Sequence, residues 1–390
     1  MVAEIRLVLI AEKNRINWHA THKTMPTSTQ LETFAAGVET TVDVAQIERQ
    51  LHELWRLAGE SSETKSSQQQ ITRACLFNFI VVCGTDAERD HATETISTLT
   101  MRHPCRAIVI LAQPAAKPME LSAAISAHCH LAGGERKQVC CEQIAIRASG
   151  AVVEKLKPVV LPLLESDLPV VIWWQGDFLQ QVELFRRLAD VADRIIYDTS
   201  SWIDPNAQLG ALAGVISEHR DCSFVDLSWT RLGLWRQIAA EFFDEPHCRA
   251  ELNRIRAVEI EHGRGPGAGV RAGLLGAWVA AQLNWSAADT TAMLHFTERD
   301  DTDTTAVGII SFVIKTDAAM FSVRKNHGEH TATATVKMPK MCGLPRKRAF
   351  RPTDDASLLS EEFDHAVRHA VYERALIMAS RLIRTGAGKL

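Results

Sequence analysis

The sequence predicts an α/β fold with two α/β units whose sheets are mixed and partly parallel, followed by a C-terminal antiparallel strand meander and a final helix. The first observation is a pair of short apolar runs, rich in β-branched and aromatic residues, within Leu168–Phe185 and Leu188–Trp202. Each run is followed by a polar, helix-compatible segment, as in strand–helix units. The second observation is three runs at 306–315, 319–326 and 330–339, in which apolar and polar residues alternate as in antiparallel strands.

The length of the chain, 390 residues, predicts two or three domains. We divide the sequence into segments 1–70, 71–150, 151–290 and 291–390. In that order they are predicted to form an N-terminal helix with a linker, a first α/β domain, a second α/β domain with Trp-rich strand ends, and the strand meander with the final helix.

Composition narrows the class of protein. Charged residues at 23% and hydrophobic residues at 46% are typical of a soluble globular protein, and a net charge of -4 gives no reason to expect nucleic-acid binding by the whole molecule. The N-terminus lacks a basic region followed by a long apolar stretch, and no run approaches about 20 apolar residues. We therefore expect a cytoplasmic protein with no membrane segment.

The first half of the chain contains a β-α-β pattern followed by a hairpin. The predicted elements are a helix at Val42–Gly59, a strand at Ala74–Gly84, a helix capped by Thr85 and Asp86 that ends before His103, a strand at Cys105–Ala112, and a hairpin of Glu120–Leu131 with Lys137–Arg147 around the turn Ala132–Arg136. The strand at Ala74–Gly84 is continuous in apolar residues, which predicts burial on both faces.

The second half continues the strand–helix alternation. The predicted elements are a helix from Ala151 interrupted by Pro158 and Pro162, strands at Val171–Trp174, Arg194–Asp198, Phe224–Trp229 and Arg254–Gly263, helices at Ala207–His219, Arg231–Phe243 and Val270–Trp285, and a last helix at Leu358–Arg384. The helix at Val270–Trp285 is mostly apolar and is therefore expected to be buried.

Nine cysteines without a CxxC motif indicate reduced thiols. In the predicted hairpin register, a row of soft ligands at His128–His130 faces Cys140 and Cys141. One interpretation is a soft metal site or a redox-switchable pair of Cys129 with Cys140, and Cys129, Cys140 and Cys141 are the candidate thiols. The favoured interpretation is that the cysteines pack as small hydrophobic side chains, because the spacing matches no zinc pattern.

The glycine-rich loop Gly263–Gly269 is a weak candidate for phosphate binding. It matches neither the dinucleotide-binding nor the P-loop template, so we expect a mobile surface loop instead. Arg264 lies in the loop and Arg271 follows it, and both keep the phosphate interpretation open.

Polar residues follow the middle strands at the end where open α/β sheets bind ligands. These residues are Gln175, Asp177, Asp198, Ser200, Asp226, Trp229 and Arg231. Asp198 is equally compatible with a helix cap, and Asp193 with Arg194 is more compatible with a structural role. No histidine lies near these strand ends to act as a base, which argues against a hydrolase.

Tryptophans are concentrated in the same part of the sequence. They are Trp173, Trp174, Trp202, Trp229 and Trp235. Indole rings are favoured in sugar sites and protein interfaces, but core packing alone would explain about half of them. Alternation along the strand places Trp173 and Trp174 on opposite faces of the sheet.

Two basic runs, Val323–His330 and Pro345–Arg351, lie in the last part of the chain. Such runs are usually solvated, although they can also bind an acidic partner.

Several blocks together resemble the OpcA family of glucose-6-phosphate dehydrogenase assembly proteins. The blocks are HPCRAIVI at His103–Ile110, CCEQIAI at Cys140–Ile146, LPLLESDLPVVIWWQGDF at Leu161–Phe178, ADRIIYDTSSW at Ala192–Trp202, DLSWTRLGLWRQIAAEFFD at Asp226–Asp244, and LLGAWVAAQLNW at Leu274–Trp285. The resemblance covers residues 75 to 290. It implies a non-catalytic assembly factor or allosteric activator of glucose-6-phosphate dehydrogenase, which supports the oxidative pentose phosphate pathway and the supply of NADPH, with no cofactor or metal of its own.

On this resemblance we select candidate residues for binding a partner or ligand. They are Trp173, Trp174, Asp177, Arg194, Asp198, Trp202, Trp229, Arg231, Trp235 and Arg236. The competing interpretation is an α/β enzyme or sensor that binds a sugar phosphate through Arg194, Arg231 or Arg271. A third is a scaffold that only stabilises the oligomer of the dehydrogenase.

Overall fold

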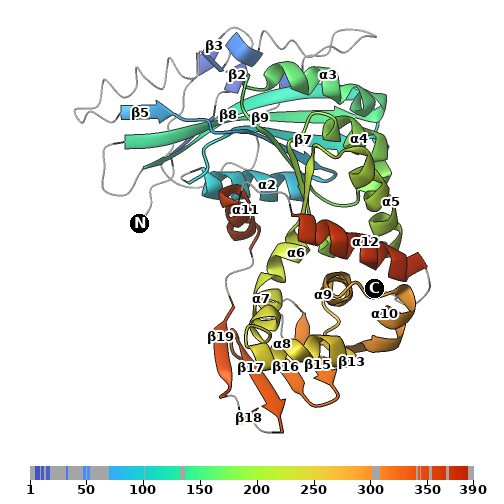
Figure 1. The fold of residues 1–390 in the computed structure, drawn as a ribbon. Coiled ribbons are helices and arrows are strands. Elements are labelled where there is room, and N and C mark those ends of the chain that lie inside the picture. Colours follow the sequence, from blue (N-terminus) through green and yellow to red (C-terminus); the bar gives the residue numbers. More distant parts are fainter. Residues whose placement is uncertain are drawn as a thin grey trace. The chain divides into compact units, whose positions relative to one another are not determined.

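The fold is seen in a computed structural model, which describes residues 5–8, 10–12, 15–17, 32–33, 47–49, 51–52, 70–100, 102–131, 137–300, 308–339, 341–342, 344–350, 354–365 and 369–384. The chain forms two compact units (Figure 1). The first unit comprises Met1–Ile196 and Leu359–His365, and the second comprises Tyr197–Leu358 and Ala366–Leu390. The division into four segments made from the sequence stays a prediction.

The first unit is built on a β-α-β motif. Strand β6 (Asn78–Cys83) is entirely buried and pairs in parallel with β7 (Arg106–Gln113), and helix α2 (Asp86–Leu99) connects them. Thr85 caps α2 by accepting a hydrogen bond from the Glu88 backbone N–H at 3.2 Å, and Glu88 bonds back to the Thr85 N–H. The predicted strand, cap, helix and strand are confirmed.

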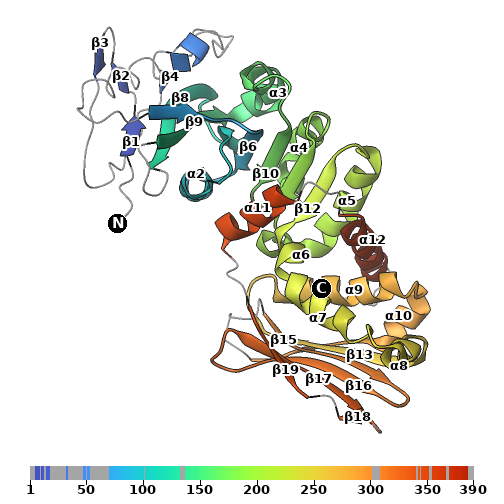
Figure 2. The same ribbon diagram turned by 60° about the vertical axis from the view of Figure 1, so that its left-hand side comes forward.

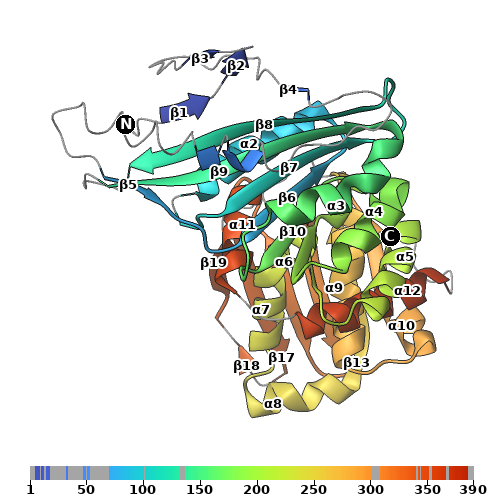
Figure 3. The same cartoon turned by 90° about the horizontal axis from the view of Figure 1, so that it is seen from above.

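The sheet of the first unit continues on both sides of this motif (Figure 3). Strand β10 (Val170–Trp174) pairs in parallel with β6, and β11 (Arg194–Tyr197) pairs in parallel with β10. Both middle strands therefore extend the sheet that begins in the first α/β segment, because their continuous apolar runs allow burial on both faces.

On the other side of β7 lies the predicted hairpin. Strand β9 (Lys137–Ser149) is parallel to β7 and antiparallel to β8 (Glu120–Leu131). The register places Cys129 opposite Cys140 and His128 opposite Cys141, so the predicted register is confirmed. The turn 132–136 lies outside the described residues.

Short strands from the N-terminal part complete the pairing. These are β1 (Ile5–Val8) and β4 (Glu32–Thr33) on β8, β5 (Gln70–Arg73) on β9, and a separate pair of β2 (Ile10–Glu12) with β3 (Arg15–Asn17). Of the predicted helix at 42–59, residues 47–49 and 51–52 are described and are helical. The remainder of that prediction lies outside the described residues.

Helical segments pack on the sheet of the first unit. After β9 come the 3-10 turn η1 (Gly150–Lys155), helix α3 (Leu156–Val160) and a second 3-10 turn η2 (Leu161–Leu163), an interrupted helix as Pro158 and Pro162 predicted. The 3-10 turn η3 (Phe178–Gln181) and helix α4 (Val182–Ala189) then precede β11. Helix α4 has a buried face that includes Phe185 and Leu188.

The second unit begins with helical segments around strand β12 (Ser223–Asp226). They are η4 (Thr199–Ser201), α5 (Pro205–Glu218), α6 (Leu227–Arg231), α7 (Gly233–Glu241), α8 (Pro246–Arg249) and η5 (Ala250–Arg254). The prediction of a strand at Phe224–Trp229 is wrong after Asp226, since the Asp226 carboxylate accepts the Ser228 backbone N–H at 2.9 Å and so caps α6.

A mixed, mainly antiparallel sheet forms the rest of the second unit, and Figure 2 shows helices on one of its faces. The strand order is β14 (Leu294–Glu298), β13 (Ile255–His262), β15 (Ile309–Thr316), β16 (Met320–Lys325), β17 (Thr331–Met338) and β18 (Met341–Cys342), and β19 (Arg346–Ala349) also pairs with β17. The pairings β15–β16 and β16–β17 are antiparallel, so the predicted meander is confirmed.

Two helices, α9 (Ala268–Gln282) and α10 (Ala287–Met293), lie between β13 and β14 in sequence. Helix α9 is buried along most of its length, as predicted. A Cβ at Gly276 would lie 2.9 Å from Phe296 Cζ, so glycine allows α9 to lie close to β14.

The prediction of one last helix at Leu358–Arg384 is wrong. The structure has α11 (Asp355–Asp364) and α12 (Ala370–Arg384), and neither His365 nor His369 is helical. Phe363 packs on Phe77 and Phe79 of the first unit at ring-centroid distances of 4.8 and 5.3 Å. Helix α12 packs on α9 and α5 of the second unit. Helical periodicity alone does not show that the two parts have separate contacts.

The predicted fold class is confirmed, with a mixed, partly parallel sheet and an antiparallel meander. Within the described residues, no helix combines the length and the apolar character needed to cross a membrane.

Candidate functional site

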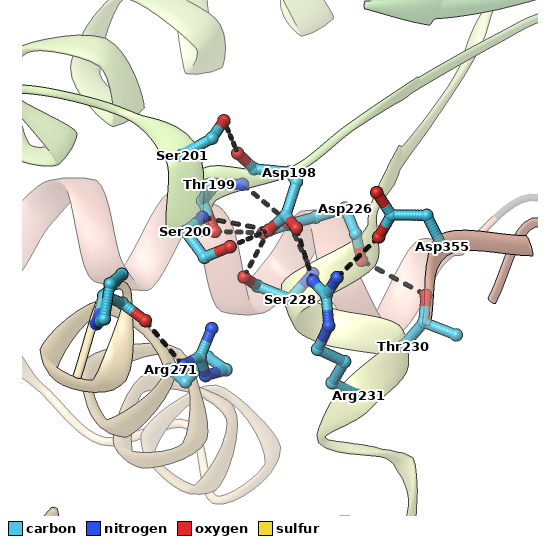
Figure 4. A network of polar contacts seen from close by, with 11 residues as sticks. Asp198, Thr199, Ser200, Ser201, Asp226, Ser228, Thr230, Arg231, Arg271 and Asp355 are labelled. Carbon is cyan, nitrogen blue, oxygen red and sulfur yellow. Dashed lines mark hydrogen bonds and ion pairs between the residues drawn. The ribbon is translucent and has the colours of Figure 1, made fainter. Parts of the chain in front are cut away.

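The candidate site is a cluster of polar side chains in the second unit, at the carboxyl ends of β11 and β12 (Figure 4). Each strand ends in an aspartate that caps the next helical turn. Asp198 accepts the backbone N–H of Ser200 at 3.0 Å, and Asp226 accepts that of Ser228 at 2.9 Å. Both predicted strand-end aspartates therefore meet in one cluster, and both also act as caps.

Asp198 is bonded to several donors at once. Its carboxylate accepts Ser200 Oγ at 2.7 Å and Ser228 Oγ at 2.8 Å, and it forms an ion pair with Arg231 at 2.5 Å. Burial opposes ionisation of this carboxyl, but Arg231 and the hydrogen bonds outweigh burial and hold the pKa of Asp198 below its usual value. Asp198 is therefore an ionised carboxylate that is already saturated with partners.

Asp226 has the opposite electrostatic balance. Its side chain is fully buried, and it accepts the Thr199 backbone N–H at 3.1 Å and Thr199 Oγ1 at 2.9 Å. Burial, followed by repulsion from Asp198, raises the pKa of Asp226 to about 7. The pKa values of two neighbouring carboxyl groups are thus shifted in opposite directions, and Asp198 is the one that pairs with Arg231.

Two buried tyrosines extend the cluster from Asp226 to α12. Tyr372 Oη donates to Asp226 at 3.4 Å, and it lies 2.7 Å from Tyr197 Oη. Burial raises the pKa of both phenols well above the usual range, so both remain neutral.

Arg231 connects the cluster to the start of α11. Its Nη1 pairs with Asp198, and its Nη2 pairs with Asp355 at 2.9 Å. The guanidinium therefore lies between two carboxylates, an arrangement that suits the planar fork of arginine.

The glycine-rich loop completes the site. Gly267 has φ 68°, and a Cβ at this position would lie 2.2 Å from Ser200 Cβ, so the loop is packed on η4. The expectation of a mobile surface loop did not anticipate this close approach. Four residues later, Arg271 is 7% exposed and donates to the Pro266 carbonyl at 2.8 Å. Burial lowers the pKa of Arg271 to about 10, although Asp198 opposes the shift.

The cluster offers little to a substrate. Its carboxylates and Arg231 are bonded to side chains of the protein itself, whereas a general base needs a free position toward a reacting group. Two surface cavities, of ≈ 490 and ≈ 530 Å³, are lined by residues outside the cluster. In the described part of the chain, no group of three or more His, Cys, Asp or Glu residues is placed to hold a metal ion.

All five predicted tryptophans lie in the interior. Their exposed fractions are 2% for Trp173, 3% for Trp174, 6% for Trp202, 2% for Trp229 and 0% for Trp235. Trp173 stacks on Phe79 and Trp174 meets Phe185, so the rings lie on opposite faces of the sheet as expected. Binding a partner directly through these rings would require them to become exposed, and their role in binding stays a prediction.

The remaining candidates have structural contacts. Asp177 caps η3 by accepting the Leu179 backbone N–H at 2.8 Å. Arg194 donates to the Glu362 carbonyl at 2.5 Å, within the first unit. Arg236 lies over the Trp229 ring, with its Cζ 3.7 Å from the centroid. Only Asp198 and Arg231, of the ten binding candidates, are hydrogen-bonded to each other within the carboxylate cluster.

The candidate thiols are placed by the hairpin. Cys129 and Cys140 are opposite each other in the register, and their side chains lie outside the described residues. The Cys141 thiol is buried and accepts the Cys105 backbone N–H at 3.1 Å. A hydrogen bond from the Cys105 thiol lowers the pKa of Cys141. The candidate role of these thiols in redox chemistry stays a prediction.

Sequence reasoning missed several members of the cluster, among them Ser228, Asp355 and Tyr372. Ser228 lay inside a predicted strand, and the other two were assigned to a distant segment. The Ser228 signal was available, because an aspartate two residues earlier is a typical cap.

The fold and the cluster define an α/β protein with two mixed sheets, of which the second is mainly antiparallel. Two family models match the chain in succession. Residues 96–214 match the glucose-6-phosphate dehydrogenase subunit N-terminal domain, and residues 222–376 match the corresponding C-terminal domain. The chain belongs to the OpcA family, as its sequence blocks indicated.

Curated relatives from cyanobacteria carry the name OxPP cycle protein OpcA. The Synechocystis protein is 31% identical over 190 residues, which are 48% of this chain and 39% of the relative. The Nostoc punctiforme protein is 29% identical over 214 residues, which are 55% of this chain and 44% of the relative. The matched part thus spans less than half the length of these relatives.

Solved oxidoreductases are similar to the chain at a much lower level. An aldose-aldose oxidoreductase from Caulobacter crescentus has a TM-score of 0.41 and 10% identity, covering 80% of this chain and 98% of that one. An NAD-binding oxidoreductase from Klebsiella pneumoniae has a TM-score of 0.45 and 9% identity, covering 80% and 96%.

Proposed function

We propose that this protein is a non-catalytic assembly factor or allosteric activator of glucose-6-phosphate dehydrogenase, acting in the oxidative pentose phosphate pathway and the supply of NADPH. The observation that carries the proposal is the succession of two family matches, at 96–214 and 222–376, both to domains of a glucose-6-phosphate dehydrogenase subunit. The names of the cyanobacterial relatives agree with this pathway. A cytoplasmic location stays a prediction.

The geometry of the cluster supports a non-catalytic role. Asp198 is ionised but saturated, and Asp226 is fully buried behind Thr199, Ser228 and Tyr372. Acid–base catalysis requires such a group to reach the substrate within hydrogen-bond distance. The cluster has the connectivity of a structural link between η4, α6, α11 and α12 instead.

The alternative is a sugar-phosphate-binding enzyme or sensor. It would use Arg194, Arg231 or Arg271, and each of these guanidinium groups already bonds within the protein. A phosphate would therefore have to replace an existing partner, at a cost in free energy for each broken bond. For this reason we rank the alternative second.

The test is a titration of the purified protein into glucose-6-phosphate dehydrogenase from the same organism. NADPH formation is followed across glucose 6-phosphate concentrations, and the mass of the dehydrogenase oligomer is measured in parallel. We expect a lower apparent KM, a larger oligomer, or both. Heat-denatured protein is the control, and an unchanged KM together with an unchanged mass would refute the proposal.

The same samples separate activation from the alternatives. Calorimetric titration with glucose 6-phosphate alone measures direct binding, which a pure assembly factor lacks and a sensor has. A scaffold would raise the thermal stability of the oligomer without changing KM once assembly is complete.

A further inference from the structure

One part of the second unit is strongly basic. Segment 320–351 contains eight lysines and arginines and one glutamate, although the whole chain has a net charge of -4. Its described residues form β16, β17, β18 and β19. Positive charge is therefore concentrated in one region of a protein whose net charge is negative. Such a region attracts anionic surfaces over distances of about a Debye length.

The sheet of the second unit has two different faces in this region. Phe321 and Val323 are buried on one face, and Phe321 contacts Phe242 and Phe243, which directly follow α7, at ring-centroid distances of 5.6 and 4.8 Å. Side chains alternate along each strand, so the intervening residues Ser322, Arg324, Thr333 and Thr335 form the opposite face, which is polar. Figure 2 shows the helices of the second unit on one face of this sheet.

The register brings polar side chains of three strands together on the open face. Ser322 is opposite Thr335, Arg324 is opposite Thr333, and Thr333 is opposite Lys347. Cross-strand neighbours of this kind lie about 5 Å apart. We call these five residues the basic face.

The basic face is hollowed. A cavity of ≈ 530 Å³ is lined by Ser322, Arg324, Lys325, Asn326, His327, Glu329, Thr333, Thr335 and Lys347. Asn326 Nδ2 donates to Thr331 Oγ1 at 2.8 Å, and Thr333 Oγ1 donates to Asn326 Oδ1 at 2.9 Å. These bonds hold the β16–β17 turn at the border of the cavity.

Hydrogen-bond donors in the cavity are available to a ligand. Ser322 Oγ and Thr335 Oγ1 have no hydrogen-bond partner among the described residues. Arg324 is 62% exposed, and its contact with Glu261 is a loose 3.7 Å. Lys347 is 57% exposed and pairs with Glu329 at 2.5 Å. Two hydroxyls and the loosely paired Arg324 thus line one hollow, together with Lys347, whose ammonium already pairs with Glu329. This donor set suits a carboxylate.

We propose that the basic face binds an acidic surface of a partner protein, with a carboxylate of the partner entering the hollow between Ser322, Arg324 and Thr335. The inference rests on the proposed function, in which the partner is the dehydrogenase, and it deepens that function by assigning the contact surface. Exposed charges of this kind mainly steer association and set its salt dependence.

A protein surface fits better than a nucleic acid. Glu329 and Glu261 lie among the cations and would repel a continuous phosphate backbone. The cavity lining contains no Trp, Tyr or Phe on which bases could stack.

The experiment compares the full-length protein with the charge-reversed variant R324E/K347E in binding to the dehydrogenase. A matched control, K155E/R220E, carries the same charge change at exposed positions outside the basic face. We expect R324E/K347E to bind at least about tenfold more weakly at low salt and to lose most of its salt dependence. The control should bind like the unsubstituted protein. Circular dichroism melting confirms folding, and R324Q/K347Q replaces the reversed variant if that variant fails to fold.

Carbodiimide cross-linking provides a second readout, because it joins amines directly to carboxylates. We expect cross-links from Lys347 or Lys325 to Asp or Glu of the dehydrogenase. If the unsubstituted protein activates the dehydrogenase but R324E/K347E binds equally well, the basic face is overturned while the proposed function stands. If the unsubstituted protein does not bind the dehydrogenase at all, both the proposed function and the role of the basic face are refuted. A third outcome is that the unsubstituted protein binds duplex DNA as tightly as it binds the dehydrogenase at physiological salt, and that R324E/K347E loses this binding. That outcome would show that the basic face binds nucleic acid and not a protein.

Discussion

Two charged regions of the second unit differ in what their charges can do. The cluster around Asp198 and Asp226 is buried, and its charges are bonded internally. The basic face around Arg324 and Lys347 is more than half exposed at both cations. A buried charge is stable only when it is paired and hydrogen-bonded within the protein. An exposed charge contributes little to stability and remains available for recognition. We therefore assign a structural role to the buried cluster and a binding role to the basic face.

The largest expected effect concerns the loop that closes the buried cluster. Gly267→Val places a Cβ 2.2 Å from Ser200 Cβ at a residue with φ 68°. We expect a loss of more than about 3 kcal/mol in the free energy of unfolding. Urea denaturation measures this value. Gly265→Ala is the matched control, because nothing lies within 4 Å of its Cβ. Equal stability of the two variants would show that the loop is not packed as described.

The next effect concerns the arginine of the cluster. Arg231→Met leaves Asp198 buried without its cation. The side chains of Arg231 and Asp198 are only 11% and 18% exposed, so water cannot replace the lost partner. We expect a loss of about 3 kcal/mol in the free energy of unfolding. Arg256→Met is the control, since Arg256 and its partner Asp317 are 69% and 52% exposed, and its stability should not change measurably. A similar result for both arginines would contradict the assignment of the cluster to structure.

The pH dependence of stability separates the two aspartates. The pKa of Asp226 is raised to about 7, so the folded chain retains a proton that the unfolded chain loses near pH 4. Its contribution to stability is complete below about pH 4 and is lost as the pH rises to about 7. Asp226→Asn should remove this decline, as measured by urea denaturation at several pH values.

Asp198 should show the opposite sign. Its pKa is lowered below the usual value, so its contribution is present at neutral pH and is lost as the pH falls through the folded-state pKa. Asp198→Asn should therefore reduce stability at neutral pH more than in acid. The same pH trend in both variants would contradict the different charge states.

The smallest effect belongs to the exposed region. Arg348 on β19 pairs with Glu241 at 3.2 Å, with side chains 44% and 26% exposed. Arg348→Gln should change the free energy of unfolding by less than about 0.5 kcal/mol. A loss comparable to that of Arg231→Met would show that the exposed cations also support the fold, and it would remove the contrast between the two regions.

Much of the fold could be predicted from local patterns. The apolar run at β6, the cap at Thr85 and the alternation along β16 each reflect contacts within a few residues. One error had a local cause and the other a long-range cause. Asp226 ended a predicted strand early, and the last helix is divided because Phe363 packs against the first unit.

The candidate site could be predicted only in part. The rule for carboxyl ends of strands brought Asp198, Asp226 and Arg231 into one list before their contacts were known. The family resemblance led us to select the tryptophans as binding candidates, whereas the structure packs all five in the interior. A tryptophan side chain buries a large apolar area in a protein core and in a protein interface alike, so residue type alone does not distinguish the two environments.

The sequence by itself determined the order of most helices and strands, the family, and the concentration of positive charge in segment 320–351. These properties depend on short-range periodicity, on ordered blocks and on composition. Only the tertiary structure decided which charges are paired. Tyr372 reaches Asp226 from 146 positions away, and Arg231 reaches Asp355 from 124. Protonation and pairing depend on burial and distance, and both arise only when separate segments pack together.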